Sequence, residues 1–549
     1  MSTRRTIVMV VMDGWGIGKK DDSNPIYIAN PKNIDYIKRH FPAGALQASS
    51  IAVGLPWNEE GNSEVGHLTL GAGRVIYQHF PRISLAIKNG SFFENKVLME
   101  AIKVAKAKGK NVNFVGILTE GNVHAAMDHV NGLIRLAQEA KLLRVNFHFF
   151  TDGKDGPPKN ALALLDKVRA EAAKIGYDGV HIGSIGGRYY GMDRDQHWNR
   201  TERAYMAITG QNDTNIRMGT NDSPQVDAGG AENLNIERFK DLKIDPKEII
   251  EASYKQGLTD EFVEPKTADP EGTVKDGDSV IFFNYREDSM RQLVEMFLNP
   301  SAVSQAISPL KDLHMASFTE YSKKFGIPVA FPPENVLNPL GSVLSENGKV
   351  QLRIAETNKY AHVTYFFNGF VEQPFPNEYR VLIPSQNVAR YDEFPEMMAK
   401  DITARAIEAV SENAYDFILI NYANTDIVAH TGNFNATLKA VATVDEQIGK
   451  LMDEVLRADG VMLITSDHGN AERLRDPVTG LPETKHDSSA VPVYVIANEL
   501  KKEKDNFEVE TSEHEVAGIL SDVAPTILEL MGIPQPAEMT GVSLMKLLR

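Results

Sequence analysis

The feature that most restricts the fold of this chain is an alternation between two kinds of segment. Short runs of β-branched, aliphatic and aromatic residues recur at residues 6–12, 112–118, 145–150, 280–283, 417–420, 461–465 and 491–496. Near-continuous apolar runs of this length are typical of strands buried on both faces. Between them lie amphipathic stretches of helical period, for example 97–108, 130–140, 161–175, 397–412 and 436–458. The alternation predicts an α/β fold with mostly parallel sheets.

Size, charge and cysteine content exclude several functional classes. The chain has 549 residues, enough for more than one domain. It carries 58 Lys and Arg against 74 Asp and Glu, a formal charge of −16. This balance disfavours nucleic-acid binding, because phosphate backbones reward a basic face. The chain has no cysteine, so disulfides, thiolate metal sites and cysteine nucleophiles are excluded.

The first apolar run bears on localisation. Residues 6–12 end at Asp13 without a cleavage-site pattern, and we find no run of 18 apolar residues. Signal peptides and membrane spans need longer apolar segments. We therefore expect a cytoplasmic protein with no membrane partner.

Several apolar runs end directly in acidic segments. Residues 6–12 lead into Asp13, residues 417–420 into a segment ending at Asp426, and residues 461–465 into Ser466-Asp467-His468. Because ligands bind at the carboxyl ends of strands in open α/β sheets, these acids predict one shared site. Taken singly, each is more simply a turn residue that ends a strand.

Three histidines accompany these acids. His430 lies four residues after Asp426, on the same face if the segment is helical. His468 follows Asp467, and His486 lies in a polar loop. Mixed carboxylate and imidazole ligands suit Mn²⁺ or Zn²⁺, and two such sets can hold two ions. A lone histidine would be an ordinary surface or core residue, but the coincidence of the whole set indicates a metal centre.

A serine lies among small residues at Gly61-Asn-Ser63-Glu-Val-Gly-His67. Serine is a weak nucleophile at neutral pH unless a base or a metal activates it. The same segment, taken alone, is read as the N-capped start of a helix. The two interpretations stay open at this point.

The longer motifs resemble those of the cofactor-independent (2,3-bisphosphoglycerate-independent) phosphoglycerate mutases, a family of the alkaline phosphatase superfamily. The resemblance rests on residues 13–16, 61–67, 187–195, 282–286, 351–362, 421–426, 430–433 and 466–470. These motifs run in order along nearly the whole chain. Residues 211–233 stand apart and are interpreted as a surface insertion.

The resemblance implies an α/β protein of two domains. Residues 1–77 and 331–549 would form a discontinuous alkaline-phosphatase-like domain that binds metal. Residues 78–330 would form an inserted α/β phosphotransferase domain that binds substrate. Segments 76–81 and 321–333 would connect the domains as hinges. The wide separation of Ser63 and Asp426 in sequence agrees with such an insertion.

The resemblance also implies two divalent ions, with Mn²⁺ preferred over Mg²⁺, Co²⁺ or Zn²⁺. One ion would be held by Asp426, His430 and His486, and the other by Asp13, Ser63, Asp467 and His468. Coordination would lower the pKa of the serine hydroxyl and make it nucleophilic.

The implied substrate contacts come from both domains. They are His124, Lys154, Asp155, Arg188, Arg194, Arg286 and Lys359. Guanidinium forks suit the phosphate and the carboxylate of phosphoglycerate. Asp155 would move protons between substrate hydroxyls, so Ser63, Asp155 and Lys359 are the implied catalytic residues. The implied reaction interconverts 3-phosphoglycerate and 2-phosphoglycerate through a phosphoserine, in glycolysis and gluconeogenesis, and we expect a monomer.

Three positions depart from the family pattern. Ala126 replaces the second histidine of Gly-Gly-Val-His-Ser-His, although His129 is close in sequence. Lys154 replaces the arginine of Asp-Gly-Arg-Asp, and lysine cannot form a bidentate fork. Ser289 replaces the last arginine of Arg-Pro-Asp-Arg, unless Arg291 substitutes for it.

These departures leave two alternatives. A related metal-dependent phosphohydrolase, or a mutase for another phosphate ester, would share the same metal residues. An inactive metal-binding or scaffold protein is the other alternative. The intact serine and metal residues argue against it.

Overall fold

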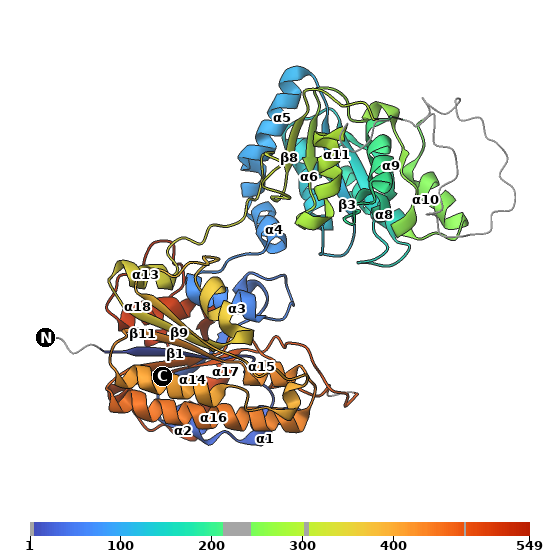
Figure 1. Ribbon diagram of the computed structural model, residues 1–549. Coiled ribbons are helices and arrows are strands. Elements are labelled where there is room, and N and C mark those ends of the chain that lie inside the picture. The colour runs from blue at the N-terminus through green and yellow to red at the C-terminus, as the bar shows by residue number, and fades with distance from the viewer. Residues whose placement is uncertain (1–4, 212–242, 301–306, 477–478, 549) are drawn as a thin grey trace. The chain divides into compact units, whose positions relative to one another are not determined.

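The structure is a computed structural model that describes residues 5–211, 243–300, 307–476 and 479–548. The chain forms two compact units (Figure 1). Unit 1 comprises Met1–Pro81 and Glu334–Arg549, and unit 2 comprises Arg82–Pro333. The expected domain boundaries, 77/78 and 330/331, lie a few residues before these limits. Apart from Gln211, the expected surface insertion at 211–233 lies outside the described residues.

Unit 1 is built on an eight-stranded sheet. Its order is β10 (Glu378–Ile383), β9 (Gln351–Glu356), β11 (Phe417–Tyr422), β1 (Ile7–Met12), β12 (Val461–Thr465), β13 (Val491–Ile496), β2 (Ala43–Gln47) and β14 (Val516–Ile519). From β10 to β12 all neighbours are parallel. β13 runs antiparallel to both β12 and β2. The predicted mostly parallel α/β sheet is confirmed, with β13 as a reversed strand.

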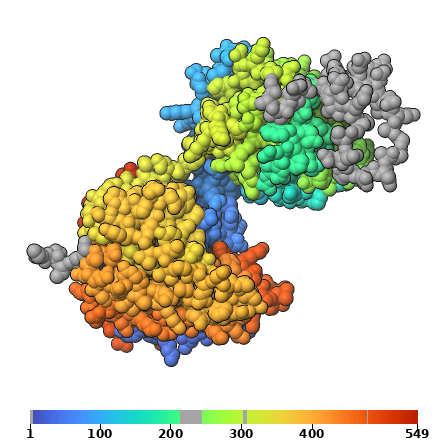
Figure 2. All heavy atoms as spheres, in the orientation of Figure 1, coloured from blue at the N-terminus to red at the C-terminus, as the bar shows by residue number. Residues whose placement is uncertain are grey.

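Both faces of this sheet are covered by helices (Figure 1). On one face, alternate side chains of β1 pack with α3 (Ser63–Ala72), α13 (Leu340–Glu346) and α18 (Val523–Leu530). On the other, the intervening side chains pack with α2 (Lys32–His40), α14 (Ala399–Ser411) and α16 (Phe434–Arg457). The orange spheres of α14 and α16 cover this second face in Figure 2. Two-sided burial explains why β1 is an unbroken apolar run.

Unit 2 contains a six-stranded sheet. Its order is β6 (Lys266–Thr267), β5 (Val180–Gly187), β4 (Val145–Thr151), β3 (Val112–Leu118), β7 (Ser279–Phe282) and β8 (His314–Ser317). All pairs are parallel except β5 with β6. The helices assigned to this part of the chain are α4 (His79–Asn89), α5 (Lys96–Lys108), α6 (Met127–Glu139), α7 (Ala161–Lys174), α8 (Arg188–Gly191), α9 (Trp198–Thr209), α10 (Pro246–Lys255) and α11 (Arg291–Leu298).

The sheet order brings particular loops together. In unit 1, the neighbouring parallel strands β9, β11, β1 and β12 end at one edge, and the segments after them carry Lys359, Asp426, Asp13 and Asp467. Unit 1 also contains the helices α1 (Pro25–Ala29), α15 (Asn424–Ala429) and α17 (Asn506–His514). In unit 2, the segments after β3, β4, β5 and β7 carry His124, Asp155, Arg188 and Arg286. Both groups therefore lie at carboxyl ends of strands, the usual ligand edge of such sheets. Within the described ranges, we find no helix with the length and apolar character needed to cross a membrane.

Candidate active site

Ser63 is the first residue of α3, and Asn62 caps that helix. The Asn62 side chain accepts a hydrogen bond from the Val65 amide at 3.0 Å, which is a standard N-cap. Ser63 is buried, and its hydroxyl lies 3.1 Å from Asp13 Oδ1 and 2.9 Å from His468 Nε2. The segment is therefore a capped helix start that also places the serine beside the acidic residues.

Lys359 lies at the centre of this cluster. Its ammonium donates to Asp13 Oδ1 at 2.5 Å, to Ser63 Oγ at 2.6 Å and to Asp426 Oδ2 at 2.7 Å. Burial favours the neutral amine, but the nearby carboxylates of Asp13, Asp426 and Asp467 outweigh it and raise the pKa of Lys359. The lysine is therefore a fixed cation that touches the serine oxygen.

Asp426, His430 and His486 converge on one point. The Nε2 atoms of His430 and His486 lie 3.2 and 3.3 Å from Asp426 Oδ1, and 3.0 Å from each other. Each Nδ1 faces a backbone carbonyl, of Thr484 at 2.9 Å and of Gly61 at 2.8 Å. Those bonds require a proton on Nδ1, which leaves each neutral Nε2 as an acceptor. Three acceptors this close repel one another unless a cation or a shared proton lies among them.

The second predicted ligand set is also brought together. His468 Nε2 lies 3.5 Å from Asp13 Oδ1 and 3.6 Å from Asp467 Oδ2. The ligand atoms also group across the predicted sets, because Asp13 and His468 lie within 4.8 Å of Asp426, and Asp13 and Asp467 lie within 4.8 Å of the unpredicted His67. Asp467 is fully buried, and its Oδ2 accepts no hydrogen bond of good geometry, although His67 Nδ1 is 3.1 Å away. Burial opposes the charge on His468, but Asp467, Asp13 and Asp426 outweigh it and raise its pKa to about 10.

Sequence reasoning did not assign roles to three residues that orient these ligands. His67 donates from Nδ1 to the Ser63 carbonyl at 2.9 Å, and its Nε2 lies 3.1 Å from Asn421 Nδ2. Asn421 also donates to Asp13 Oδ2 at 2.8 Å, and Asn470 donates to Asp426 Oδ1 at 2.9 Å. Metal ligands usually have such oriented partners. The spacing of His67 four residues after Ser63 on one helix was the available signal.

The donor set fits divalent metal ions. Three buried carboxylates and three imidazoles meet in one place, together with the Ser63 hydroxyl. Buried carboxylates are costly unless they are paired or coordinate a metal. Lys359 alone cannot balance three of them. Carboxylate and imidazole ligands suit Mn²⁺, Co²⁺ and Zn²⁺.

In unit 2, Arg188 is the hub of a second cluster. Its Nη1 donates to Asp152 Oδ1 and to Asp155 Oδ2, both at 2.5 Å, and its Nη2 lies 2.8 Å from His124 Nε2. Asp155 Oδ2 is also 3.5 Å from His124 Nε2. The structure thus brings His124, Asp155 and Arg188 together, and their role as substrate contacts stays a prediction. Asp152 is an unpredicted partner that holds the arginine.

The remaining predicted substrate residues are arranged differently. Arg194 Nη1 and Arg286 Nε both bond to Asp288, at 2.5 and 3.1 Å. Lys154 is exposed, and no side-chain bond joins it to a described residue. Arg291, considered as a substitute for the missing arginine, donates instead to the Tyr321 carbonyl at 2.7 Å. His129 Nε2 bonds to Ser84 at 3.0 Å.

His124 should remain neutral far below neutral pH. Its burial, and then the charge of Arg188, lower its pKa to about 4, against about 6.5 for free imidazole. We expect an NMR titration of its ring protons to show a midpoint near 4. The variant Arg188→Gln should raise that midpoint, because it removes a nearby positive charge. Arg169→Gln, at an exposed arginine paired with Asp245, should leave it unchanged. A wild-type midpoint near 6.5 would contradict this account of the cluster.

Comparisons with known proteins agree with this geometry. Residues 5–535 match the family model described as the metalloenzyme superfamily. The chain is 41% identical over 548 residues to the 2,3-bisphosphoglycerate-independent phosphoglycerate mutase of Clostridium novyi (strain NT), covering 99% of this chain and 100% of that protein. It is 42% identical to the enzyme of the same name from Moorella thermoacetica, covering 99% of both chains.

A solved structure shows the same relationship. The crystal structure of Leishmania mexicana phosphoglycerate mutase at low cobalt concentration matches with a TM-score of 0.50 and 29% identity. The match covers 100% of this chain and 98% of that one. The chain therefore belongs to the 2,3-bisphosphoglycerate-independent phosphoglycerate mutase family of the metalloenzyme superfamily.

Proposed function

We propose that this protein interconverts 3-phosphoglycerate and 2-phosphoglycerate through a phosphoserine on Ser63, without 2,3-bisphosphoglycerate. The observation that carries the proposal is the position of the Ser63 oxygen, within hydrogen-bond distance of Asp13, His468 and Lys359. The test is an isomerisation assay with purified protein, added Mn²⁺ and no bisphosphoglycerate. Formation of 2-phosphoglycerate from 3-phosphoglycerate is the expected result.

The charge balance of unit 1 supports two divalent ions. Asp13, Asp426 and Asp467 together carry three negative charges, and Lys359 supplies one positive charge. Two divalent ions added to this set give a net charge of +2, which matches a phosphoryl group of charge near −2. We propose Asp426, His430 and His486 for one ion, and Asp13, Ser63, Asp467 and His468 for the other. Bound ions would lower the pKa of the Ser63 hydroxyl and stabilise charge on the phosphoryl oxygens.

Mn²⁺ is the proposed metal. Its support is the mixture of carboxylate and imidazole ligands, which also suits Co²⁺ and Zn²⁺. The Leishmania mexicana enzyme was crystallised at low cobalt concentration, as its title states. Mg²⁺ prefers oxygen ligands and water, so three histidines favour the softer ions.

The protein groups have separate roles in this proposal. Ser63 Oγ, having lost its proton to solvent because its pKa is lowered, forms a bond to phosphorus while the bond from phosphorus to the substrate oxygen breaks. Lys359 donates to the serine oxygen and places its charge beside the phosphoryl group. The released glycerate oxygen gains a proton, and later the other hydroxyl loses one as it takes the phosphoryl group back. We assign these proton transfers to Asp155, which Arg188 holds beside His124.

Arg188, Arg194 and Arg286 are the proposed anchors of the substrate phosphate and carboxylate, with His124 and Lys154 beside them. Guanidinium forks bind both groups in a bidentate way. We further propose a cytoplasmic monomer that acts in glycolysis and gluconeogenesis. The net charge of −16 supports a small-molecule substrate over nucleic acid.

Arg286→Ala should reduce kcat/KM more than Lys154→Ala. Arg286 offers a planar fork beside Arg194, with Asp288 between them, whereas Lys154 is an exposed point charge. We expect a loss of about 100-fold or more for Arg286→Ala, in line with a charged hydrogen bond left unmade, and less than about tenfold for Lys154→Ala. Steady-state kinetics of both variants check the ranking. Equal losses would show that Lys154 grips the substrate as strongly as Arg286.

A related metal-dependent phosphohydrolase is the alternative, and its support is the altered set of arginines. Lys154 and Ser289 replace two arginines of the family pattern, which weakens the expected grip on glycerate. A weakly held glycerate would leave before the phosphoryl group returned, and water would then release phosphate. Measuring inorganic phosphate in the same assay separates the two activities.

A further inference from the structure

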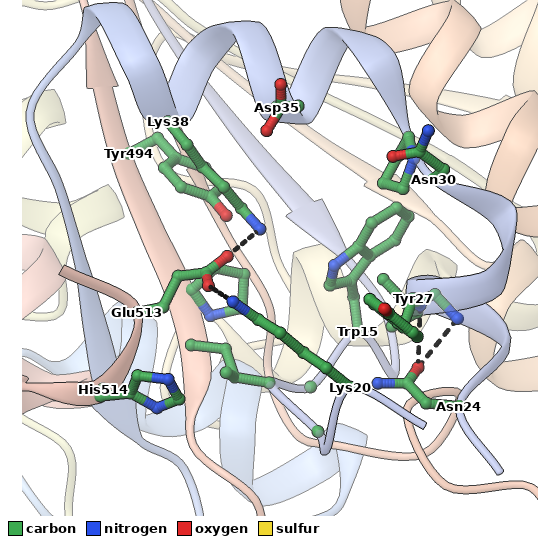
Figure 3. Close-up of a pocket in the computed structure, with 16 residues that line it drawn as sticks. Trp15, Lys20, Asn24, Tyr27, Asn30, Asp35, Lys38, Tyr494, Glu513 and His514 are labelled. Carbon is green, nitrogen blue, oxygen red and sulfur yellow. Dashed lines mark hydrogen bonds and ion pairs between the residues drawn. The ribbon is translucent and has the colours of Figure 1, made fainter. Parts of the chain in front are cut away.

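A cavity of about 220 Å³ lies in unit 1, and none of the residues that line it has a role in the proposed reaction. It is lined by the loop after β1, by α1 and α2, by β13 and by the end of α17, and it is open to solvent on one side. Figure 3 shows its polar lining, which includes Trp15, Lys20, Tyr27, Lys38, Tyr494 and Glu513. The apolar part of the wall is formed by Ile17, Ile26 and Pro492.

Two buried side chains present unused hydrogen-bond donors to this cavity. Trp15 and Tyr494 are each only 3% exposed. Within the part of the chain that the structure describes, neither the indole N–H nor the phenol hydroxyl has a hydrogen-bond partner. In Figure 3 both polar atoms point into the same space. Both donors face the open space of the cavity, where a ligand that accepts hydrogen bonds would bond to them.

The charges around the cavity favour an anion. Lys20 Nζ lies 3.0 Å from Glu513 Oε2, and Lys38 Nζ donates to the other oxygen of the same carboxylate. Two lysines against one glutamate leave a charge of +1, since Asp35 is paired with Arg39 at 2.9 Å. Each ammonium has three N–H groups, so sharing Glu513 leaves donors on both lysines. A single negative charge would balance the site.

We propose that this cavity binds a small organic monocarboxylate with a flat apolar body. Its carboxylate accepts hydrogen bonds from the Tyr494 hydroxyl, the Trp15 indole and the Lys38 ammonium. Its apolar part lies among the aromatic and aliphatic side chains of the wall. The volume is below the roughly 300–1,000 Å³ of pockets for drug-sized ligands, which restricts the ligand to a small acid.

The test uses benzoate as the probe, measured by isothermal titration calorimetry on the full chain. We expect saturable binding to the wild type. Acetate, which keeps only the carboxylate, and benzyl alcohol, which keeps only the ring, should each bind at least about tenfold more weakly. Tyr494→Phe removes one oxygen and Lys38→Gln removes one charge. Each substitution should weaken benzoate binding by about tenfold or more, the size expected for a lost hydrogen bond to a charged group.

Matched controls separate this site from others. Lys32→Gln removes the same charge from an exposed residue on the same helix, and it should leave the affinity unchanged. Trp15→Phe keeps an aromatic ring but loses the N–H, so it should behave like Tyr494→Phe. Thermal unfolding should show that all variants are folded. Benzoate affinity that is unchanged in the three cavity variants, or no saturable binding to the wild type, would overturn the proposal. Tighter binding of inorganic phosphate than of benzoate at this site would overturn the carboxylate assignment.

Discussion

Ser63→Ala should lower the rate of isomerisation by several orders of magnitude, the usual result when a covalent nucleophile is lost. The change removes one oxygen and little volume, and Asp426, His430 and His486 keep their contacts with one another. The variant should therefore fold and still bind metal at that set. Without the hydroxyl, no acceptor exists for the phosphoryl group. Stopped assays with phosphate-labelled substrate should detect an acid-stable phosphoserine in the wild type and none in the variant.

Two comparisons sharpen this prediction. Ser342→Ala, at a serine on α13 that bonds to Glu346, should keep normal activity and normal phosphoserine. Asp155→Asn should still form some phosphoserine while slowing isomerisation, because Asp155 is assigned to proton transfer on glycerate. Near-normal isomerisation by Ser63→Ala would eliminate the phosphoserine route.

Removing divalent ions should abolish activity, and Mn²⁺ should restore it. Asp426 Oδ1 and the Nε2 atoms of His430 and His486 lie within 3.3 Å of one another. When the imidazoles are neutral, none of these three atoms carries a proton. A bound cation would satisfy these three acceptor atoms. Asp426→Asn removes the charge that both histidines share and should weaken metal binding by about 10- to 100-fold or more, the range seen even for groups that only support ligands.

The controls for the metal prediction are chemical and structural. Asp401→Asn, at an exposed carboxylate on α14, should change neither metal content nor activity. Metal affinity should fall as the pH is lowered, because only neutral imidazoles bind metal, and the nearby carboxylates raise the pKa of His430 and of His468 in the metal-free protein. Metal analysis and activity are measured on the same chelated sample. Full activity in a sample that contains no metal would rule out the two-metal mechanism.

The local patterns of the sequence were sufficient for the fold class. β1, β3, β4, β11, β12 and β13 coincide closely with the apolar runs, and α5, α7, α14 and α16 with the amphipathic stretches. A strand covered by helices on both faces is usually a near-continuous apolar run, and a helix on a sheet is usually apolar on one side. Weaker patterns were missed. β14 is half exposed, and β6 has only two residues, so neither carries enough apolar signal to be seen.

Much of the metal cluster also followed from the sequence, because Asp13, Asp426 and Asp467 end strands that the apolar runs reveal. Their meeting requires β11, β1 and β12 to be neighbours, and the runs alone do not give strand order. The reversal of β13 was likewise invisible, because an apolar run reads the same in either direction.

What the sequence by itself determined is the set of elements, the family motifs and the residue types of the site. Only the tertiary structure decided that Lys359 bonds to both Asp13 and Asp426, that His67 and Asn421 hold the ligands, and that Arg188 is shared by Asp152 and Asp155. The same is true of the Trp15 and Tyr494 donors in one cavity. The physical reason is the distance along the chain over which each kind of interaction acts. Apolar period and capping act within a few residues, whereas these contacts join residues dozens to hundreds of positions apart and exist only once the sheet has ordered its strands.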